Sequence, residues 1–226
     1  MSRGYFVTGT DTGVGKTLVS AALLHAFAAQ DLRVVGMKPV AAGCEWRDGE
    51  PYWEDVAQLQ AASNVDAPLA LRNPYRFDPP IAPHIAAAQA GTRIETATLQ
   101  RAYADLQNYA DMVIVEGAGG FYVPLNESET MADLACQLSL PVILVVAMRL
   151  GCINHALLTA QAIVDQGLIL AGWVANQLDP QMQMMADNLA SLEQRISAPL
   201  LGILPYQHPV SAQQVSIRLQ IGRLSL

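Results

Sequence analysis

Residues 9–17 read Gly-Thr-Asp-Thr-Gly-Val-Gly-Lys-Thr and stand between an apolar run and an amphipathic one. A strand, a glycine-containing loop and a helix start in this order are typical of a loop that binds phosphate groups. Lys16 can reach the outer phosphates of a nucleoside triphosphate, and the Thr17 hydroxyl can bind Mg²⁺. The usual pattern has its first glycine at the position of Thr10, so the match has one departure. The spacing predicts a nucleoside triphosphate and a metal ion as ligands.

Two further charged residues end apolar runs. Glu116 closes the run 112–116 and is followed by Gly-Ala-Gly-Gly, and Lys38 closes the run 34–38. A carboxylate at a strand end beside a phosphate-binding loop is well placed to hold Mg²⁺. Two lysines aimed at one crevice, Lys16 and Lys38, favour an anionic reacting group over simple nucleotide storage. A solvated carboxylate and a strand-flanking cation are the simpler alternatives.

Asp55 and Asn176 are weaker candidates. Asp55 opens a helix-like segment and, taken alone, is more typical of a helix N-cap than of a metal ligand. Asn176 ends the run 171–176, and its amide both donates and accepts, as reading a purine requires; capping the next helix is an equal alternative. Residues 176–179 only faintly resemble a guanine-reading Asn-Lys-x-Asp pattern, because Gln177 breaks it. The choice among ATP, GTP and CTP therefore stays open.

These residues must be positioned by alternating strands and helices. Strand-like apolar runs cover residues 5–8, 34–38, 112–116, 142–147, 171–176 and 200–204. Helical patterns cover residues 16–30, 99–109, 131–138, 154–166 and 182–195. This alternation predicts an α/β fold, a doubly wound and mostly parallel sheet flanked by helices, with ligands at the carboxyl ends of the strands.

The segment 44–94 is the irregular part of the chain. It is rich in proline and has no clear strand, so we expect loops and two short helices, 55–63 and 83–89, laid over the edge of the sheet. No internal repeat or low-complexity linker interrupts the chain. We therefore expect one P-loop NTPase-like domain over residues 1–226.

Composition restricts the classes of protein. A hydrophobic fraction of 52% and a charged fraction of 15% are typical of a compact soluble protein. The net charge of −7 and the lack of a Lys/Arg cluster argue against nucleic-acid binding. No apolar run is long enough to span a membrane, and the N-terminus lacks the apolar part of a signal peptide. Three widely spaced cysteines indicate neither a disulfide framework nor a zinc site, which favours the cytoplasm.

Seven stretches of the chain together resemble the dethiobiotin synthetase family, from about residue 3 to about residue 206. The phosphate-binding loop alone is shared with many NTPases, whereas Glu-Gly-Ala-Gly-Gly and Gly-Cys-Ile-Asn-His at this spacing are much more specific. The stretches are residues 9–17, 38–40, 73–75, 83–84, 115–120, 150–155 and 172–176.

The resemblance implies a ligase of biotin biosynthesis. That family uses ATP and Mg²⁺ to join CO₂ to 7,8-diaminopelargonic acid, which closes the cyclic urea of dethiobiotin. One amine carries CO₂ as a carbamate, and a carbamate oxygen attacks the γ-phosphate to give a carbamic–phosphoric anhydride. The second amine then attacks the carbonyl and expels phosphate. Holding both amines close makes this last step intramolecular, worth up to about 7–11 kcal/mol.

The resemblance also implies roles for individual residues. The catalytic residues would be Lys38, Lys16 and Thr12, and the Mg²⁺ ligands Thr17, Asp55 and Glu116. The nucleotide would contact Gly13, Val14, Gly15, Lys16, Thr17, Leu18, Asp55, Glu116, Gly117, Ala118, Gly119, Asn176, Gln177, Pro205, Tyr206 and Gln207. The second substrate would contact Lys38, Ala42, Gly151, Cys152, Ile153 and Asn154. In the family the site lies at a homodimer interface, and the loop matching 151–154 reaches the substrate carboxylate of the neighbouring subunit.

Two departures from the family pattern bear on the substrate site. Ala42 stands where the family usually has serine, so one hydroxyl is absent and we expect a loss on the order of 1 kcal/mol. The tail 208–226 does not match the pattern, which leaves any nucleotide contact from it unassigned.

Two other classes of protein share this type of loop. One is a nucleotide-driven switch of the partition or septum-positioning type, which carries a lysine where this chain has Asp11. Such switches also tend to have a basic or amphipathic surface helix, and the sequence shows none. The other is a cobyrinate-type synthetase, which needs a glutaminase half that a chain of 226 residues has no room for.

Overall fold

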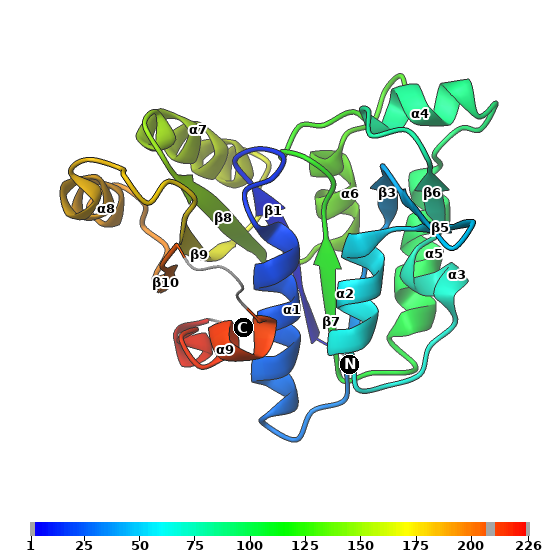
Figure 1. The fold of residues 1–226 in the computed structure, drawn as a ribbon, viewed down its shortest axis with the longest axis horizontal. Coiled ribbons are helices and arrows are strands. Elements are labelled where there is room, and N and C mark those ends of the chain that lie inside the picture. Colours follow the sequence, from blue (N-terminus) through cyan, green and yellow to red (C-terminus); the bar gives the residue numbers. More distant parts are fainter. Residues whose placement is uncertain (1–2, 207–210, 225–226) are drawn as a thin grey trace.

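The computed structural model describes residues 3–206 and 211–224. A six-stranded sheet runs through the described part of the chain, in the order β10-β9-β8-β1-β7-β2, and every neighbouring pair is parallel (Figure 1). The strands are β1 (Arg3–Gly9), β2 (Val34–Met37), β7 (Met112–Glu116), β8 (Val142–Met148), β9 (Leu170–Gln177) and β10 (Leu200–Leu204). The predicted doubly wound α/β fold is therefore confirmed.

Helices cover both faces of the sheet (Figure 1). One hydrophobic cluster joins the sheet to α1, α2 and α9, and the other joins it to α5, α6 and α7. Successive residues of β1 divide between the clusters, with Tyr5 and Val7 in one and Phe6 in the other, as the two-residue period of a strand requires. The helices are α1 (Lys16–Ala28), α2 (Glu54–Ala62), α3 (Leu69–Arg72), α4 (Pro83–Gln89), α5 (Thr96–Leu106), α6 (Met131–Leu138), α7 (Cys152–Asp165), α8 (Met185–Glu193) and α9 (Ala212–Ser216), with a 3₁₀ turn, η1 (Ile221–Arg223).

The strand order brings the charged strand ends together. β1 leads directly into the phosphate-binding loop, β7 lies beside it, and β2 lies on the other side of β7. In the parallel register Val7 pairs with Glu116, and Met37 pairs with Val115. Lys38, one residue beyond Met37, therefore leaves the sheet at the level of Glu116. The carboxyl ends of these three strands form one edge, where ligands of doubly wound sheets bind.

The segment 44–94 contains strands that the sequence did not predict. β4 (Glu45–Arg47) and β5 (Glu50–Tyr52) form an antiparallel hairpin, and β6 (Tyr75–Phe77) pairs in parallel with β3 (Val40–Ala42). The expectation of no strand here was wrong, because three residues are too few to show a two-residue period. The two short helices expected in this segment are confirmed as α2 and α4.

Several helix ends differ from the sequence predictions. α7 begins at Cys152 rather than at residue 154, and α8 begins at Met185 rather than at residue 182. α5 lies three residues nearer the N-terminus than predicted, at Thr96–Leu106. Helix ends are set by local caps rather than by apolar spacing, so periodicity places them only to within a few residues. The expectation of one domain over residues 1–226 stays a prediction.

Candidate nucleotide-binding and catalytic site

The phosphate-binding loop joins β1 to α1, and two of its glycines are in the left-handed region of backbone space. Gly13 has a φ of 71° and Gly15, the residue before α1, has a φ of 93°. A Cβ on Gly15 would collide with the side-chain amide of Asn176, so glycine is required there for space as well as for conformation. The backbone N–H groups that begin α1 have no partner inside the helix, which makes this end attractive to phosphate.

Lys16 lies at the start of α1 and is almost fully buried. Its Nζ donates a hydrogen bond to the main-chain oxygen of Asp11 at 2.8 Å. Burial lowers the pKa of Lys16 to about 8, and the nearby charge of Lys38 acts in the same direction, against the opposing effect of Glu116. The loop thus holds its own lysine folded back toward the place where phosphates bind.

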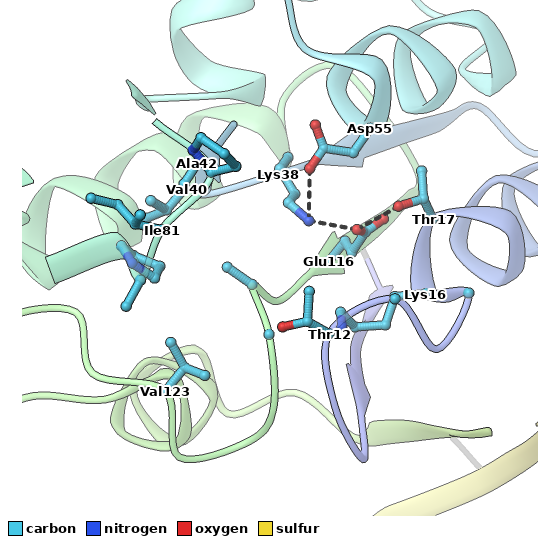
Figure 2. Close-up of a pocket in the computed structure, with 17 residues that line it drawn as sticks. Thr12, Lys16, Thr17, Lys38, Val40, Ala42, Asp55, Ile81, Glu116 and Val123 are labelled. Atoms are coloured by element: carbon cyan, nitrogen blue, oxygen red, sulfur yellow. Dashed lines mark hydrogen bonds and ion pairs between the residues drawn. The ribbon is translucent and has the colours of Figure 1, made fainter. Parts of the chain in front are cut away.

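Lys38 lies between two carboxylates from different elements (Figure 2). Its Nζ is 2.6 Å from Oε1 of Glu116 and 3.0 Å from Oδ2 of Asp55. The Thr17 hydroxyl donates to the same Glu116 oxygen at 2.9 Å. Burial lowers the pKa of Lys38, but the two carboxylates outweigh it and leave the pKa above its ordinary value. The ammonium therefore carries its charge across the physiological pH range.

The residues predicted to bind Mg²⁺ suit a hard cation. Thr17, Asp55 and Glu116 supply hydroxyl and carboxylate oxygens, the donors that Mg²⁺ prefers. Oε2 of Glu116 is buried and finds no hydrogen-bond partner among the described residues, which fits an oxygen kept for a ligand. Within residues 3–206 and 211–224, no three His, Cys, Asp or Glu side chains lie close enough together to hold a metal ion. The predicted Mg²⁺ ligands are two carboxylates and a hydroxyl.

The alternative interpretation of Asp55 as a helix N-cap is wrong. α2 begins at Glu54 with Trp53 as its N-cap, so Asp55 lies inside the first turn. Its Oδ1 accepts a hydrogen bond from the Val56 N–H at 2.9 Å, and its Oδ2 faces Lys38. The structure thus brings Asp55 to the charged group at the sheet edge.

A cavity of about 620 Å³ opens at this edge of the sheet. Lys16 and Lys38 both line it, together with the predicted residues Thr12, Gly13, Gly15, Thr17, Ala42, Asp55, Glu116, Ala118 and Gly119. Figure 2 shows Thr12, Lys16 and Thr17 on one side, and Val40, Ala42 and Ile81 opposite them. The remaining lining residues are Pro80, Ala82, Pro83 and Val123. One half of the cavity is charged and the other is apolar.

A second cavity, of about 580 Å³, lies on the other side of Gly15, which lines both. It contains the predicted residues Leu18, Asn176, Gln177, Pro205 and Tyr206. Gln207, also predicted for this part of the site, lies outside the described residues. The phosphate-binding loop therefore separates a charged cavity from one lined mostly by amide and apolar groups.

Of the remaining predicted residues, some contribute through other contacts and some line neither cavity. Asn176 lies within β9 and caps no helix; its Nδ2 donates to the Val14 main-chain oxygen at 2.9 Å. Gly117 offers its main-chain oxygen to Lys38 Nζ at 3.4 Å. Among the described residues, the stretch 151–154 lines neither cavity, and it begins α7 with Gly151 and Asn154 exposed.

Sequence reasoning missed several residues that line the two cavities. Ile81 and Val123 line the charged cavity, and Gln214 of α9 and Arg218, two residues beyond its end, line the second. The prolines around residue 80 are a local signal for Ile81, and Val123 lies three residues beyond the stretch 115–120. The tail carries no motif, so α9 reaches the site only through its packing against α1.

Comparisons with known proteins identify a family model and relatives of this chain. A family model described as an AAA domain matches residues 3–214. An ATP-dependent dethiobiotin synthetase BioD from Nitrosospira multiformis is 56% identical over 226 residues, which are 100% of this chain and 98% of the relative. A protein of the same name from Aromatoleum aromaticum is 53% identical over 219 residues, 97% of each chain.

Solved structures of low sequence identity share the fold. The septum site-determining protein MinD from Pyrococcus horikoshii, complexed with Mg-ADP, gives a TM-score of 0.62 at 14% identity and covers 98% of this chain and 96% of its own. A ParA family ATPase from Chlorobium tepidum gives 0.59 at 14% identity, covering 99% and 95%. At this identity the likeness extends to the fold alone.

The fold and the loop define a P-loop protein that uses a nucleotide. The full-length identity above 50% goes further than the fold, because it covers the charged cavity, the second cavity and the stretch 151–154 together. The chain belongs to the ATP-dependent dethiobiotin synthetase family. The nucleotide-driven switch, the alternative class, is not favoured, because its representatives here resemble the chain in fold only.

Proposed function

We propose that this chain is a dethiobiotin synthetase, an ATP- and Mg²⁺-dependent cyclo-ligase that closes a urea ring on 7,8-diaminopelargonic acid with CO₂. The names and full-length identity of the relatives support the reaction. The observation that carries the proposal is that Lys16 and Lys38 line one cavity beside the phosphate-binding loop. Two ammonium groups at one place suit a reaction in which two anions must meet.

The reaction begins with an amine of the substrate that has added CO₂ as a carbamate. A carbamate oxygen forms a bond to the γ-phosphorus of ATP, and the bond from that phosphorus to the bridging oxygen of ADP breaks. The second amine then attacks the carbamate carbon and loses a proton, and the new C–N bond replaces the C–O bond to phosphate. The products are the cyclic urea, ADP and phosphate.

Lys16 and Lys38 have different tasks in this proposal. Lys16 belongs to the loop that cradles the phosphates, and it offsets the charge that develops on the transferred group. Lys38 comes from the sheet edge opposite, and its Nζ sits beside Glu116, facing the same cavity. It would hold the carbamate against the γ-phosphate and reduce the repulsion between the two anions.

We propose that Thr17, Asp55 and Glu116 hold Mg²⁺. The bound ion would neutralise phosphate charge and orient the triphosphate. The buried, unpartnered Oε2 of Glu116 supports this assignment. Because Lys38 Nζ now lies between the Asp55 and Glu116 carboxylates, metal and lysine would share the same two partners.

The apolar half of the charged cavity suits the hydrocarbon chain of the substrate. Val40, Ala42, Ile81 and Val123 present only aliphatic groups there. Each Å² of apolar surface removed from water contributes about 25 cal/mol of favourable free energy. Such a wall therefore favours a ligand with several methylenes. Ala42 offers no hydroxyl at this wall, in contrast to the family pattern.

We propose that the second cavity holds the base and that it prefers adenine. One of the two N–H groups of Asn176 Nδ2 is committed to the Val14 oxygen at 2.9 Å, which leaves the amide oxygen and the second N–H for a ligand. This acceptor and donor match adenine, which presents a donating N6 amino group beside the acceptor N7, whereas guanine presents two acceptors, O6 and N7, at that edge. ATP is therefore favoured over GTP, and the amino group of CTP is tolerated.

We further propose a cytoplasmic homodimer in which residues 151–154 complete the site of the partner. These residues start α7, and the free N–H groups of a helix start suit a carboxylate. Among the described residues no helix is long and apolar enough to span a membrane. Leu158, exposed on the same helix, offers a test: Leu158→Asp should yield a monomer by light scattering that has lost activity. A fully active monomer would refute the shared site.

The proposed reaction is tested by phosphate release. Purified protein with ATP, Mg²⁺ and bicarbonate should release phosphate only when the diamine is present, and mass spectrometry should detect the cyclic urea. Phosphate release at the same rate without the diamine would identify a simple nucleotide hydrolase and overturn the proposal.

A further inference from the structure

The link between β2 and β3 carries Lys38 but belongs to neither strand ladder. Pairing of β2 with β7 ends at Met37, and pairing of β3 with β6 begins at Val40. Lys38 and Pro39 lie between these points, and Pro39 has no N–H to donate. Something other than a sheet must therefore hold the main chain at Lys38.

Two consecutive residues hold both main-chain polar groups of Lys38. Its N–H donates to the Arg72 oxygen at 2.8 Å. Its carbonyl oxygen accepts a hydrogen bond from Nδ2 of Asn73 at 2.6 Å. A segment more than thirty residues further along the chain thus takes the place of a neighbouring strand.

The Asn73 side chain is itself tightly placed. It is 1% exposed, and Nδ2 donates a second hydrogen bond, to the Tyr75 oxygen at 3.1 Å. Oδ1 finds no hydrogen-bond partner among the described residues, so the amide contributes its two donors. The Asn73 N–H is bound to the Leu69 oxygen at the end of α3, and Pro74 restricts the Asn73 backbone to extended conformations.

The position of the Lys38 ammonium depends on this anchor. Nζ is four methylenes from the main chain, yet it meets Glu116 at 2.6 Å and Asp55 at 3.0 Å in a buried place. A shift of the main chain by a fraction of an ångström would change both distances. We propose that Asn73 is a positioning residue, which clamps the Lys38 carbonyl and thereby aims the ammonium at the reacting anions; the proposal rests on the proposed function.

Asn126 is a matched control. It is also buried, and its Nδ2 also donates twice, to the Ile94 oxygen at 2.9 Å and to Glu129 at 2.7 Å. It lines neither of the two large cavities that the described residues form. Asn126→Ala should lower stability as Asn73→Ala does, because both leave buried groups unpaired, but without touching Lys38.

The experiment compares Asn73→Ala and Asn126→Ala in turnover and in nucleotide affinity. Asn73→Ala should lower kcat by about tenfold to a hundredfold, since small misplacements near the chemistry have effects of that size. The KM for ATP should stay within about twofold, because the phosphate-binding loop is unchanged. Asn126→Ala should leave kcat within about twofold of wild type below its melting temperature. In a Lys38→Ala background, Asn73→Ala should cause no further loss.

Two results would overturn the positioning role. One is an unchanged kcat in Asn73→Ala, and the other is an equal loss with and without Lys38. If Asn73→Ala does not fold, Asn73→Ser keeps one donor and is judged by the same comparisons. If wild type shows no diamine-dependent phosphate release, the proposed function fails. The crystal structure of Asn73→Ser then tests the positioning role by itself. Lys38 Nζ should move away from Glu116, and an unmoved Nζ would refute the role.

Discussion

The two cavities on either side of Gly15 are built from different kinds of residue. The cavity at the sheet edge gathers two lysines and two carboxylates within hydrogen-bonding reach of one another or of the loop. The second cavity is lined mainly by amides and apolar groups, with Arg218 as the charged residue among those described. The charges at the first cavity suit the reaction of two anions, whereas the shape and the hydrogen-bonding groups of the second suit recognition of the nucleotide base. Substitutions in the first cavity should therefore change kcat, and substitutions in the second should change nucleotide affinity.

The largest expected effect is on turnover, from Lys38→Ala. Without the ammonium the carbamate and the γ-phosphate repel each other, so kcat should fall by about 10²–10³-fold. Nucleotide should still bind with similar affinity, because Lys16 and the loop remain. Rapid-quench turnover and nucleotide titration measure the two quantities. Arg93→Ala, which removes an exposed cation paired with Glu95, is the control and should change neither. Equal turnover in Lys38→Ala and wild type would end the assignment.

A smaller effect is expected from Glu116→Gln. An amide in place of the carboxylate removes one anionic ligand and the charge that faces Lys38, so the Mg²⁺ concentration needed for nucleotide binding should rise about tenfold. A Mg²⁺ titration of nucleotide binding by calorimetry measures it. Glu127→Gln, at an exposed position beside Arg93, should leave the titration unchanged. An unaltered Mg²⁺ requirement in Glu116→Gln argues against this carboxylate as a ligand.

The smallest expected effect lies in the second cavity. Asn176→Ala removes the amide that faces the base and the hydrogen bond to Val14, so ATP affinity should fall about tenfold, or about 1.4 kcal/mol. The preference for ATP over GTP should shrink, while kcat at saturating ATP stays close to wild type. Asn188→Ala, at a partly exposed position on α8, is the control. A loss of kcat with unchanged affinity would break the division between the two cavities.

Much of the charged cavity could be predicted because its residues stand at strand ends. Lys38 and Glu116 each close an apolar run, and Thr17 follows the loop that leaves β1; parallel strands deliver their carboxyl ends to one edge. The fold class followed from the same alternation. The sequence pattern does not predict which atoms of a side chain already form a hydrogen bond within the protein, as Nδ2 of Asn176 does with Val14.

The parts that could not be predicted depend on long-range packing. Asn73 gave no local sign of its hydrogen bond to Lys38, because three short strands and two helices, β3 to α3, lie between the partners in the chain. Gln214 and Arg218 reach the second cavity only because α9 packs on α1. Three-residue strands such as β6 are too short for periodicity and form because a neighbouring strand is present. The resemblance to a family indicated more of the site than spacing alone.

We propose above that the two lysines bring a carbamate and the γ-phosphate of ATP together. Following one carbamate oxygen atom into the released phosphate is the most direct test of this proposal. With freshly supplied C¹⁸O₂, the diamine and unlabelled ATP, a carbamic–phosphoric anhydride must leave one labelled oxygen on the released phosphate, because the carbamate C–O bond breaks when the ring closes. Mass spectrometry of the phosphate should therefore show one ¹⁸O per turnover. Phosphate that carries no label, formed together with the cyclic urea, would contradict the account.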